Sequence, residues 1–447
     1  MIHGKRAVVF LALAALFTIL VYFKSATASL TVRSLRTAVP QVVGLGDYFD
    51  HEQQYGLEGS LSHPPPDHPH MYSNTSHPQP DATGFDPSTI SITPVGRPAR
   101  EFTRNLIMAR MKADNVTWLD DNSLGPEITK VIYVADDPKA LHHPPKNKGH
   151  EVMTYLTYII EFYENLPDVS IFMHSHQFAW HNNDLLNFDA AEMIKRLSSE
   201  RVLRNGYMNM RCHWMPGCPE WIHPGEVEPD QEKLEQSMIA EAWAELFPGK
   251  SIPQVLAQPC CSQFALSRDR ILSIPKETYD HYRRWLLRSP IRDTMSGRIF
   301  EYIWQVIFAD SPIFCPNQRS CYCDGFGVCF EDEASFDKWF ELRFHKREAE
   351  ARLAEWEDKA AKIEAYRVHH DGGGSGSEDG DSSWSQALEG AKNIEIPEPG
   401  QDEELRTTIR ELDADLEYRR LLAMQRGTDP RIRAESDGRQ WNEGDGF

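Results

Sequence analysis

The stretch GHEVMTYLTYIIEFYENLPDVSIFMHSH, residues Gly149–His176, decides the fold of this chain. From Glu151 to Leu166, apolar side chains recur at helical spacing, which predicts a helix with one buried face. Asp168–Met173 is short and nearly all apolar, which predicts a buried strand. The strand runs directly into a polar triplet, HSH, at residues 174–176. A helix followed by a buried strand is the repeating unit of an α/β fold.

The same alternation continues on both sides of this stretch. Ile128–Ala135 predicts another buried strand, which the turn residues after it bring to an end. The other expected elements are a strand at Ser262–Leu266 and helices at Phe188–Glu200, Asp230–Phe247, Pro275–Leu287 and Asp293–Phe308. We therefore expect an α/β domain over residues 101–345, with a single, mostly parallel sheet covered by helices.

The composition of the 447-residue chain excludes several classes of protein. It has 47 Lys+Arg against 67 Asp+Glu, a net charge of −20. This balance argues against nucleic acid as a partner, because phosphate contacts need clustered cations. With 40% apolar and 26% charged residues, the chain is neither wholly disordered nor a polytopic membrane protein.

The N-terminus carries a candidate membrane anchor. Residues 1–6 are basic, and residues 7–23 are an uncharged apolar run long enough to span a bilayer. This order predicts a cytosolic tail, a transmembrane signal anchor and a luminal body, as in a single-pass type II membrane protein. A small-residue site ending at Ala28 leaves a second interpretation open, in which cleavage after Ala28 releases a secreted protein.

Long segments flank the predicted domain. Residues 24–100 are rich in Pro and His without apolar periodicity, which predicts a disordered stem. Residues 346–370 predict a charged helical extension. Residues 371–447 begin with a Gly/Ser-rich linker and carry about half of the net negative charge, so we expect an acidic, largely disordered tail.

The cysteines indicate an oxidising compartment. They are eight in number: Cys212, Cys218, Cys260, Cys261, Cys315, Cys321, Cys323 and Cys329. Four disulfides are the favoured interpretation, because the last four do not have the paired spacing of a zinc site. A vicinal bridge would be strained, so Cys260 and Cys261 are expected to pair with other cysteines. Two sequons, at Asn74 and Asn115, could carry glycans in the same compartment.

Polar residues follow two of the predicted strands, where open α/β sheets bind ligands. His174 and His176 could ligate a divalent metal or contact a phosphate, and hydrogen bonding to the loop backbone is the alternative. Asp136 and Asp137 follow the other strand and could hold a ribose, a base or a metal. An ordinary Asp-Pro turn is the alternative there.

Two helices add further candidates. Lys148, His150 and Glu151 stand at the start of a helix, where backbone N–H groups beside a lysine suit a diphosphate, although ordinary capping explains them too. Arg298 and Glu301 lie on the polar face of the helix at 293–308. A carboxylate aimed into a cleft can deprotonate a hydroxyl. An Arg–Glu pair on a wet surface is the alternative.

The motifs together resemble a known family. The stretches NKGHEVMTYLTYIIEFYENLPDVSIFMHSH, RCHWMPGCPEWIHP, QPCCSQFALSRDRI and SGRIFEYIWQVIF resemble fungal proteins that share the domain of unknown function numbered 3431. The resemblance covers roughly Ile128–Phe330, which is most of the predicted domain. That family has no established activity.

The order of elements is also similar to that of glycosyltransferases of the A-type fold. In those enzymes a D-x-D triplet after a strand holds a metal and the sugar diphosphate, and a later helix often carries an acidic base. The resemblance implies that Glu301 is the base, with Arg298 orienting the acceptor or binding phosphate, and that Gln263 and Arg268 bind substrate. The triplet here is HSH, a departure from D-x-D; some enzymes of that fold use basic residues instead.

We therefore expect a disulfide-stapled luminal protein of the Golgi that transfers a sugar from a nucleotide-sugar donor to a glycan or another hydroxyl acceptor. Manganese is the candidate metal, at His174 and His176. The first alternative is a non-catalytic domain that binds glycans or proteins, which the missing D-x-D favours. The second is a metal-dependent hydrolase built on His174, His176 and Asp136.

Overall fold

The computed structural model describes residues 102–125, 127–224, 235–371, 397–443 and 445–447. These residues form two compact units, one of residues 102–195 and 206–315 and one of residues 196–205 and 316–447. The predicted anchor at residues 7–23, the stem and Asn74 lie outside the described residues. Within the described part of the chain, no helix combines the length and apolarity that a membrane span requires.

The first unit, called the α/β unit below, is built on one five-stranded sheet with the order β2-β1-β3-β5-β4. The strands are β1 (Arg104–Arg110), β2 (Ile128–Val134), β3 (Val169–His174), β4 (Tyr207–Asn209) and β5 (Phe264–Ser267). β1 pairs in parallel with β2 and β3, whereas β5 runs antiparallel to both of its neighbours, β3 and β4. The sheet is therefore mixed. The expectation of a mostly parallel sheet was wrong, because the apolar pattern of a fully buried strand carries no information on its direction.

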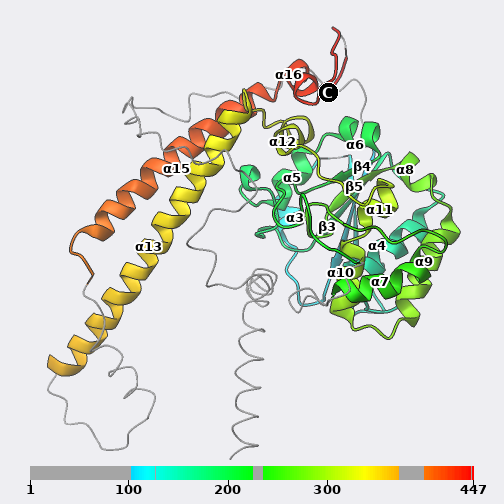
Figure 1. Cartoon of the computed structure of the whole chain (residues 1–447), viewed down its shortest axis with the longest axis horizontal. Coiled ribbons are helices and arrows are strands. Elements are labelled where there is room, and N and C mark those ends of the chain that lie inside the picture. Colours follow the sequence, from blue (N-terminus) through cyan, green and yellow to red (C-terminus); the bar gives the residue numbers. More distant parts are fainter. Residues whose placement is uncertain (1–101, 126, 225–234, 372–396, 444) are drawn as a thin grey trace, which may run out of the picture. The chain divides into compact units, whose positions relative to one another are not determined.

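Helices cover this sheet (Figure 1). In chain order they are α3 (Trp118–Asp121), α4 (Glu151–Phe162), η2 (Asp184–Leu186), α5 (Ala190–Arg196), α7 (Glu235–Leu246), α8 (Arg268–Leu272), α9 (Lys276–Arg288), α10 (Asp293–Glu301) and α11 (Trp304–Phe308). The helix α4 connects β2 to β3 and packs against β1, α9 and α10. The predicted helix at 293–308 is thus two helices, α10 and α11, with a break at Tyr302 and Ile303.

An aromatic core joins residues 149–176 to the rest of this unit. Tyr155 of α4 and Phe172 of β3 have ring centroids 5.0 Å apart. Phe264 of β5 lies 4.9 Å from Phe172 and 5.1 Å from Trp304 of α11. All four side chains are buried. Burial of one such side chain contributes roughly 1.5–3 kcal/mol, so this cluster fixes α4, α11 and the middle of the sheet together.

The second unit, called the helical unit, contains α6 (Ser199–Asn205), α12 (Gln318–Phe326), α13 (Glu333–Asp371), α15 (Gln401–Arg426) and α16 (Pro430–Ser436). The helices α13 and α15 pair as an antiparallel hairpin (Figure 1), in which Trp339 Nε1 donates to the Leu416 carbonyl at 3.0 Å. The prediction of disorder after residue 371 was therefore wrong for residues 401–436. Leu405, Leu416 and Ala423 form a buried apolar stripe that the high charge of this segment obscured.

All eight cysteines are in disulfides, which confirms that part of the sequence prediction. The pairs include Cys218–Cys315 in the α/β unit and Cys323–Cys329 in the helical unit. The expectation that Cys260 and Cys261 pair elsewhere was wrong, because they are bonded to each other. The loop accommodates this vicinal bridge through an unusual backbone, with φ of 88° at Cys261 and 50° at Ser262.

Candidate functional site

The sheet of the α/β unit has a topological switch point between β1 and β3. The strand β2 lies on one side of β1 and β3 lies on the other, and all three strands are parallel. In such sheets, ligands bind outside the carboxyl ends of the strands at the point where the order reverses. Because β5 is antiparallel to β3, the residues that lead into β5 reach the same edge. This edge, called the switch edge below, is the candidate site.

His174 at the end of β3 is part of a hydrogen-bonded chain at the switch edge. Its backbone N–H donates to Gln263 Oε1 at 3.1 Å, and Gln263 Nε2 donates to Asn182 Oδ1 at 3.0 Å. The rings of His174 and His181 have centroids 4.8 Å apart. His174 Nε2 is buried and has no hydrogen-bond partner among the described residues. The structure thus brings together two predicted site residues, His174 and Gln263.

The rest of the HSH triplet belongs to a braced loop. Ser175 Oγ donates to Asp114 Oδ2 at 3.1 Å, and the Ser175 carbonyl accepts a hydrogen bond from Trp118 Nε1 at 2.9 Å. His176 follows in the same loop and is half-buried. The triplet is therefore anchored, through its middle residue, to the segment that follows β1.

Asp136 and Asp137 are both tied to Lys112, which follows β1. Asp136 Oδ1 accepts the Lys112 backbone N–H at 2.7 Å, and Asp137 Oδ2 lies 2.9 Å from Lys112 Nζ. The hydrogen bond from the Lys112 side chain, followed by one from the Lys139 backbone, lowers the pKa of Asp137. The Lys112 side chain is 69% exposed and brings a cation to the switch edge. Lys112 was not predicted as a site residue, because the strand β1 before it was not predicted.

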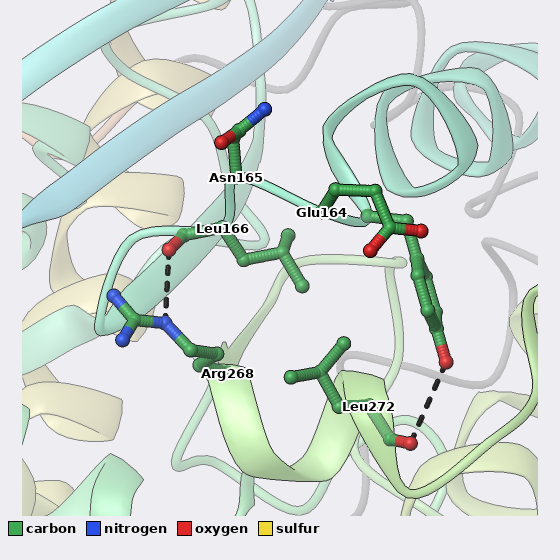
Figure 2. Close-up of a pocket in the computed structure, with 6 residues that line it drawn as sticks. Glu164, Asn165, Leu166, Arg268 and Leu272 are labelled. Atoms are coloured by element: carbon green, nitrogen blue, oxygen red, sulfur yellow. Dashed lines mark hydrogen bonds between the residues drawn. The ribbon is translucent and has the colours of Figure 1, made fainter.

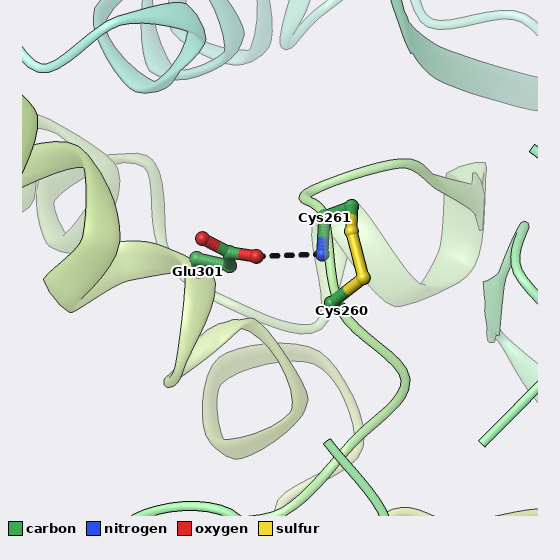
Figure 3. Close-up of side chains that lie close together, drawn as sticks. All are labelled: Cys260, Cys261 and Glu301. Carbon is green, nitrogen blue, oxygen red and sulfur yellow. Dashed lines mark hydrogen bonds between the residues drawn. A yellow bond between two sulfur atoms is a disulfide. The ribbon is translucent and has the colours of Figure 1, made fainter. Parts of the chain in front are cut away.

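Glu301 ends α10 beside the vicinal disulfide (Figure 3). Its Oε1 atom accepts the Cys261 backbone N–H at 2.7 Å, and its carbonyl accepts Gln258 Nε2 at 2.7 Å. Cys261 stands two residues before Gln263, so Glu301 contacts the same segment, leading into β5, that bonds to His174. Among the residues that the structure describes, Cys260, Cys261 and Glu301 are the group of three potential metal ligands that lie together.

The metal ligands predicted from sequence do not form such a group. His174, His176 and Asp136 are absent from the three-ligand groups found in the described residues. Asp136 instead accepts the backbone N–H of Lys112. A hydrolase built on these three side chains therefore has no support in this geometry.

The start of α4 packs closely against α10. A Cβ atom added at Gly297 would lie 3.2 Å from His150 Cδ2 and 3.3 Å from the Gly149 carbonyl oxygen, so a larger residue here would push the two elements apart by a few tenths of an ångström. His150 precedes the helix with a φ of 52°, and Glu151 provides the acidic first turn. This contact positions α10 one turn before Glu301.

The three predicted cations are held by groups of the protein. Lys148 is buried, and its Nζ donates to the carbonyls of Ser289 at 2.6 Å and Ile291 at 3.0 Å. Arg298 Nη1 lies 3.3 Å from Oε1 of the buried Glu235, which also accepts the Tyr302 hydroxyl at 3.0 Å. Lys148 therefore ties the start of α4 to the segment between α9 and α10, and Arg298 ties α10 to α7.

Arg268 lies away from the switch edge. It follows β5, and its Nε donates to the Leu166 carbonyl, just before β3, at 2.9 Å. There it borders a pocket of 410 Å³ whose lining residues are Tyr163, Glu164, Asn165, Leu166, Arg268 and Leu272 (Figure 2). This pocket lies at the amino end of β3, the end opposite to His174.

The comparisons with known proteins give one match. A family model described as a protein of unknown function (DUF3431) matches residues 106–324. No curated protein and no solved structure matches the chain significantly.

Proposed function

The chain belongs to this family of proteins of unknown function, and we propose that its α/β unit transfers a sugar from a nucleotide-sugar donor to a hydroxyl of a glycan or another acceptor. One observation carries the proposal. Polar residues after β1 and β3 meet at a topological switch point, and the half-buried carboxylate of Glu301 reaches the same edge. A ligand site with an adjacent base is the minimum that sugar transfer requires.

In this proposal the donor lies over the carboxyl ends of β1 and β3. Lys112 is exposed enough to turn from Asp137 to a diphosphate, at the loss of a surface ion pair that contributes little to stability. His174, whose Nε2 lacks a partner among the described residues, adds a second group able to donate to a phosphate oxygen.

Manganese fits these residues poorly. That ion prefers carboxylate, carbonyl and water oxygens, whereas the triplet offers imidazole rings. The nearby carboxylates of Asp136 and Asp137 are bound to Lys112. We therefore propose transfer without a metal, in which cationic and hydrogen-bonding side chains offset the charge of the diphosphate.

Glu301 is the base in this proposal. Its carboxylate takes the proton of the acceptor hydroxyl, the acceptor oxygen bonds to the anomeric carbon, and the nucleoside diphosphate leaves with the electrons of the broken bond. The hydrogen bond from the Cys261 backbone orients the carboxylate. A positioned base of this kind contributes typically 10²–10⁴-fold to the rate.

The proposed location is the Golgi lumen, with residues 7–23 as the membrane anchor. The oxidation of all eight cysteines supports an oxidising compartment, because such disulfides are rare in the cytosol. The exposed side chain of Asn115 also suits a luminal protein.

The test combines donor binding and turnover. The purified protein is screened by thermal shift against nucleotide sugars, with and without manganese, since a ligand of the folded state raises the melting temperature. Release of nucleoside diphosphate is then measured with glycan acceptors. We expect Glu301→Gln to lower turnover 10²–10⁴-fold while the donor-induced shift persists.

Asp293→Asn is the matched control, because Asp293 is an exposed acid at the other end of the same helix. It should leave turnover unchanged. Normal turnover by the Glu301 variant would remove this residue from the mechanism. A folded protein that responds to no nucleotide sugar would disprove the transferase proposal.

A specific observation favours a second candidate, a carbohydrate-binding domain without catalysis. Lys148, Arg298 and Arg268 are all held by protein groups and are not placed to meet a diphosphate. Binding of glycans without binding of any nucleotide sugar would identify this function.

A further inference from the structure

We propose that Cys260, Cys261 and Glu301 form a metal site for a thiophilic divalent cation of the zinc class when the vicinal disulfide is reduced (Figure 3). The two sulfur atoms and a carboxylate oxygen already lie within 4.8 Å of one another. Two thiolates and one carboxylate, completed by water, match the tetrahedral preference of zinc. The same set disfavours magnesium and manganese, which prefer oxygen ligands alone.

The rearrangement that the site needs is small. Two thiolates on one tetrahedral zinc stand about 3.8 Å apart, since each Zn–S bond is about 2.3 Å. The two sulfur atoms, which are bonded to each other in the disulfide, must therefore move apart. A carboxylate oxygen must come about 1 Å closer to them than the 4.8 Å that bounds the present distances. Figure 3 shows the Glu301 carboxylate on the Cys261 backbone N–H, with the two sulfur atoms beyond that nitrogen, so the carboxylate must turn about this hydrogen bond toward the sulfurs.

Opening the vicinal disulfide costs less stability than opening Cys218–Cys315. Cys218–Cys315 closes a separation of 97 residues, whereas Cys260–Cys261 closes a separation of one and restricts the unfolded chain less. The folded backbone also holds Cys261 and Ser262 at positive φ, which is costly for residues with a side chain.

The chemistry balances with a dithiol as the reductant. The dithiol gives two electrons and two protons to the cystine and becomes a disulfide, and Cys260 and Cys261 become thiols. Zinc then binds both sulfurs as thiolates, and the two thiol protons are released to water.

The surroundings hold the ligands in place. The Cys261 N–H fixes one carboxylate oxygen of Glu301, as outer hydrogen bonds do for metal ligands. Gln258 ties this loop to the Glu301 carbonyl, and Gln258 Oε1 in turn accepts the Tyr207 hydroxyl at 2.7 Å. Glu301 is half-buried, whereas Cys260 and Cys261 are buried, so an ion would approach from the side of Glu301.

Metal binding would also remove the proposed base, because a Glu301 carboxylate bound to zinc cannot accept a proton. This consequence rests on the proposed function. The metal site itself does not, and its test uses no activity.

The experiment titrates zinc into the full chain under anaerobic conditions, after reduction with a phosphine that is then removed. A chromophoric indicator competes for the metal. Cys260→Ser/Cys261→Ser is compared with the matched pair Cys218→Ser/Cys315→Ser, which removes another disulfide of the same unit. We expect wild type and the matched pair to bind one equivalent more than the Cys260/Cys261 variant, and Glu301→Gln to weaken that equivalent at least tenfold.

A second measurement avoids substitutions. In the reduced wild type, mass spectrometry follows the alkylation of each cysteine with and without zinc. Zinc should slow alkylation of Cys260 and Cys261 at least tenfold relative to Cys218 and Cys315. Equal zinc binding by wild type and the Cys260/Cys261 variant, or equal alkylation rates with and without zinc, would overturn the proposal.

Discussion

Two carboxylates show how differently the two units of this protein use a buried negative charge. Asp324 of the helical unit is fully buried, and its oxygens lie 2.9 Å from Arg201, 2.7 Å from Arg204 and 2.7 Å from Arg439. Glu301 of the α/β unit is half-buried and accepts a backbone N–H. Charged partners on several sides fix Asp324 as an ion, whereas a backbone N–H beside the vicinal disulfide holds the Glu301 carboxylate.

The proton affinity of Asp324 follows from this arrangement. Burial alone would raise the pKa of its carboxyl, but Arg204, Arg201 and Arg439 outweigh burial and lower the pKa below its ordinary value of 3.8. A carboxylate of such low basicity is a poor proton acceptor. The comparison therefore assigns Asp324 to stability and keeps Glu301 as the candidate for chemistry.

The largest expected effect on stability comes from Asp324→Asn. This change leaves several guanidinium groups without their buried anion, and breaking a buried ion pair from one side typically costs about 3–5 kcal/mol. Hydrogen exchange in α6, α12 and α16 should accelerate, and the helical unit should unfold at a lower temperature. Glu403→Gln, at an exposed position in the first turn of α15, is the control and should shift stability by less than about 0.5 kcal/mol.

Glu301→Gln is the counterpart of Asp324→Asn in the α/β unit. It should change the free energy of unfolding far less than Asp324→Asn does. Similar losses for the two variants would show that Glu301 is as structural as Asp324.

Acid offers a second way to test the role of Asp324. Because its folded-state pKa is lowered, its stabilising contribution is complete above the ordinary value of 3.8 and is lost as the pH falls through the folded-state pKa. Stability of the helical unit, followed by hydrogen exchange or thermal unfolding from pH 5 to pH 2, should drop in wild type. The drop should be smaller in Asp324→Asn. An equal drop in both would exclude Asp324 as a source of acid sensitivity.

Two buried tyrosine hydroxyls in the α/β unit allow a comparison of smaller effects on stability. Tyr155 is fully buried, and its hydroxyl has no hydrogen-bond partner among the described residues. The buried Tyr207 hydroxyl donates to Gln258 Oε1 at 2.7 Å. Tyr155→Phe should therefore stabilise by about 1 kcal/mol, and Tyr207→Phe should destabilise by about 1 kcal/mol. Urea unfolding of both variants measures the signs, and a loss of stability in Tyr155→Phe would reveal a hidden partner.

The elements that were predictable from sequence are the long or strongly apolar ones. The helix α4 and the strands β2 and β3 appear within a few residues of their expected ranges. Most residues of α4 and β3 are buried and apolar, whereas β2 is recognisable by the apolar run at its end. β1 was missed, since Arg104–Arg110 has charged ends and a short apolar centre. The antiparallel direction of β5 depends on partners that no local pattern encodes.

The positions of the candidate site residues were predictable from the sequence only in part. The polar triplet after β3 and Glu301 on α10 followed from strand and helix positions. The position of the Lys148 side chain could not be predicted from the sequence, because its hydrogen-bond partners are carbonyls about 140 residues further along the chain. The vicinal Cys260–Cys261 bridge depends on positive φ values that the surrounding fold imposes.

The smallest effect on stability is expected from removal of the sequon at Asn115, which belongs to the α/β unit. Asn115 and Thr117 are exposed, and Asn115 Oδ1 accepts the Thr117 backbone N–H at 3.0 Å. Secreted from a eukaryotic host, wild type should lose mass on treatment with a glycosidase, and Asn115→Gln should lose less. Stability should change by less than about 0.5 kcal/mol, since the site is on the surface. The absence of any glycan at Asn115 in such a host would weaken the case that the α/β unit, and with it Glu301, works in the lumen.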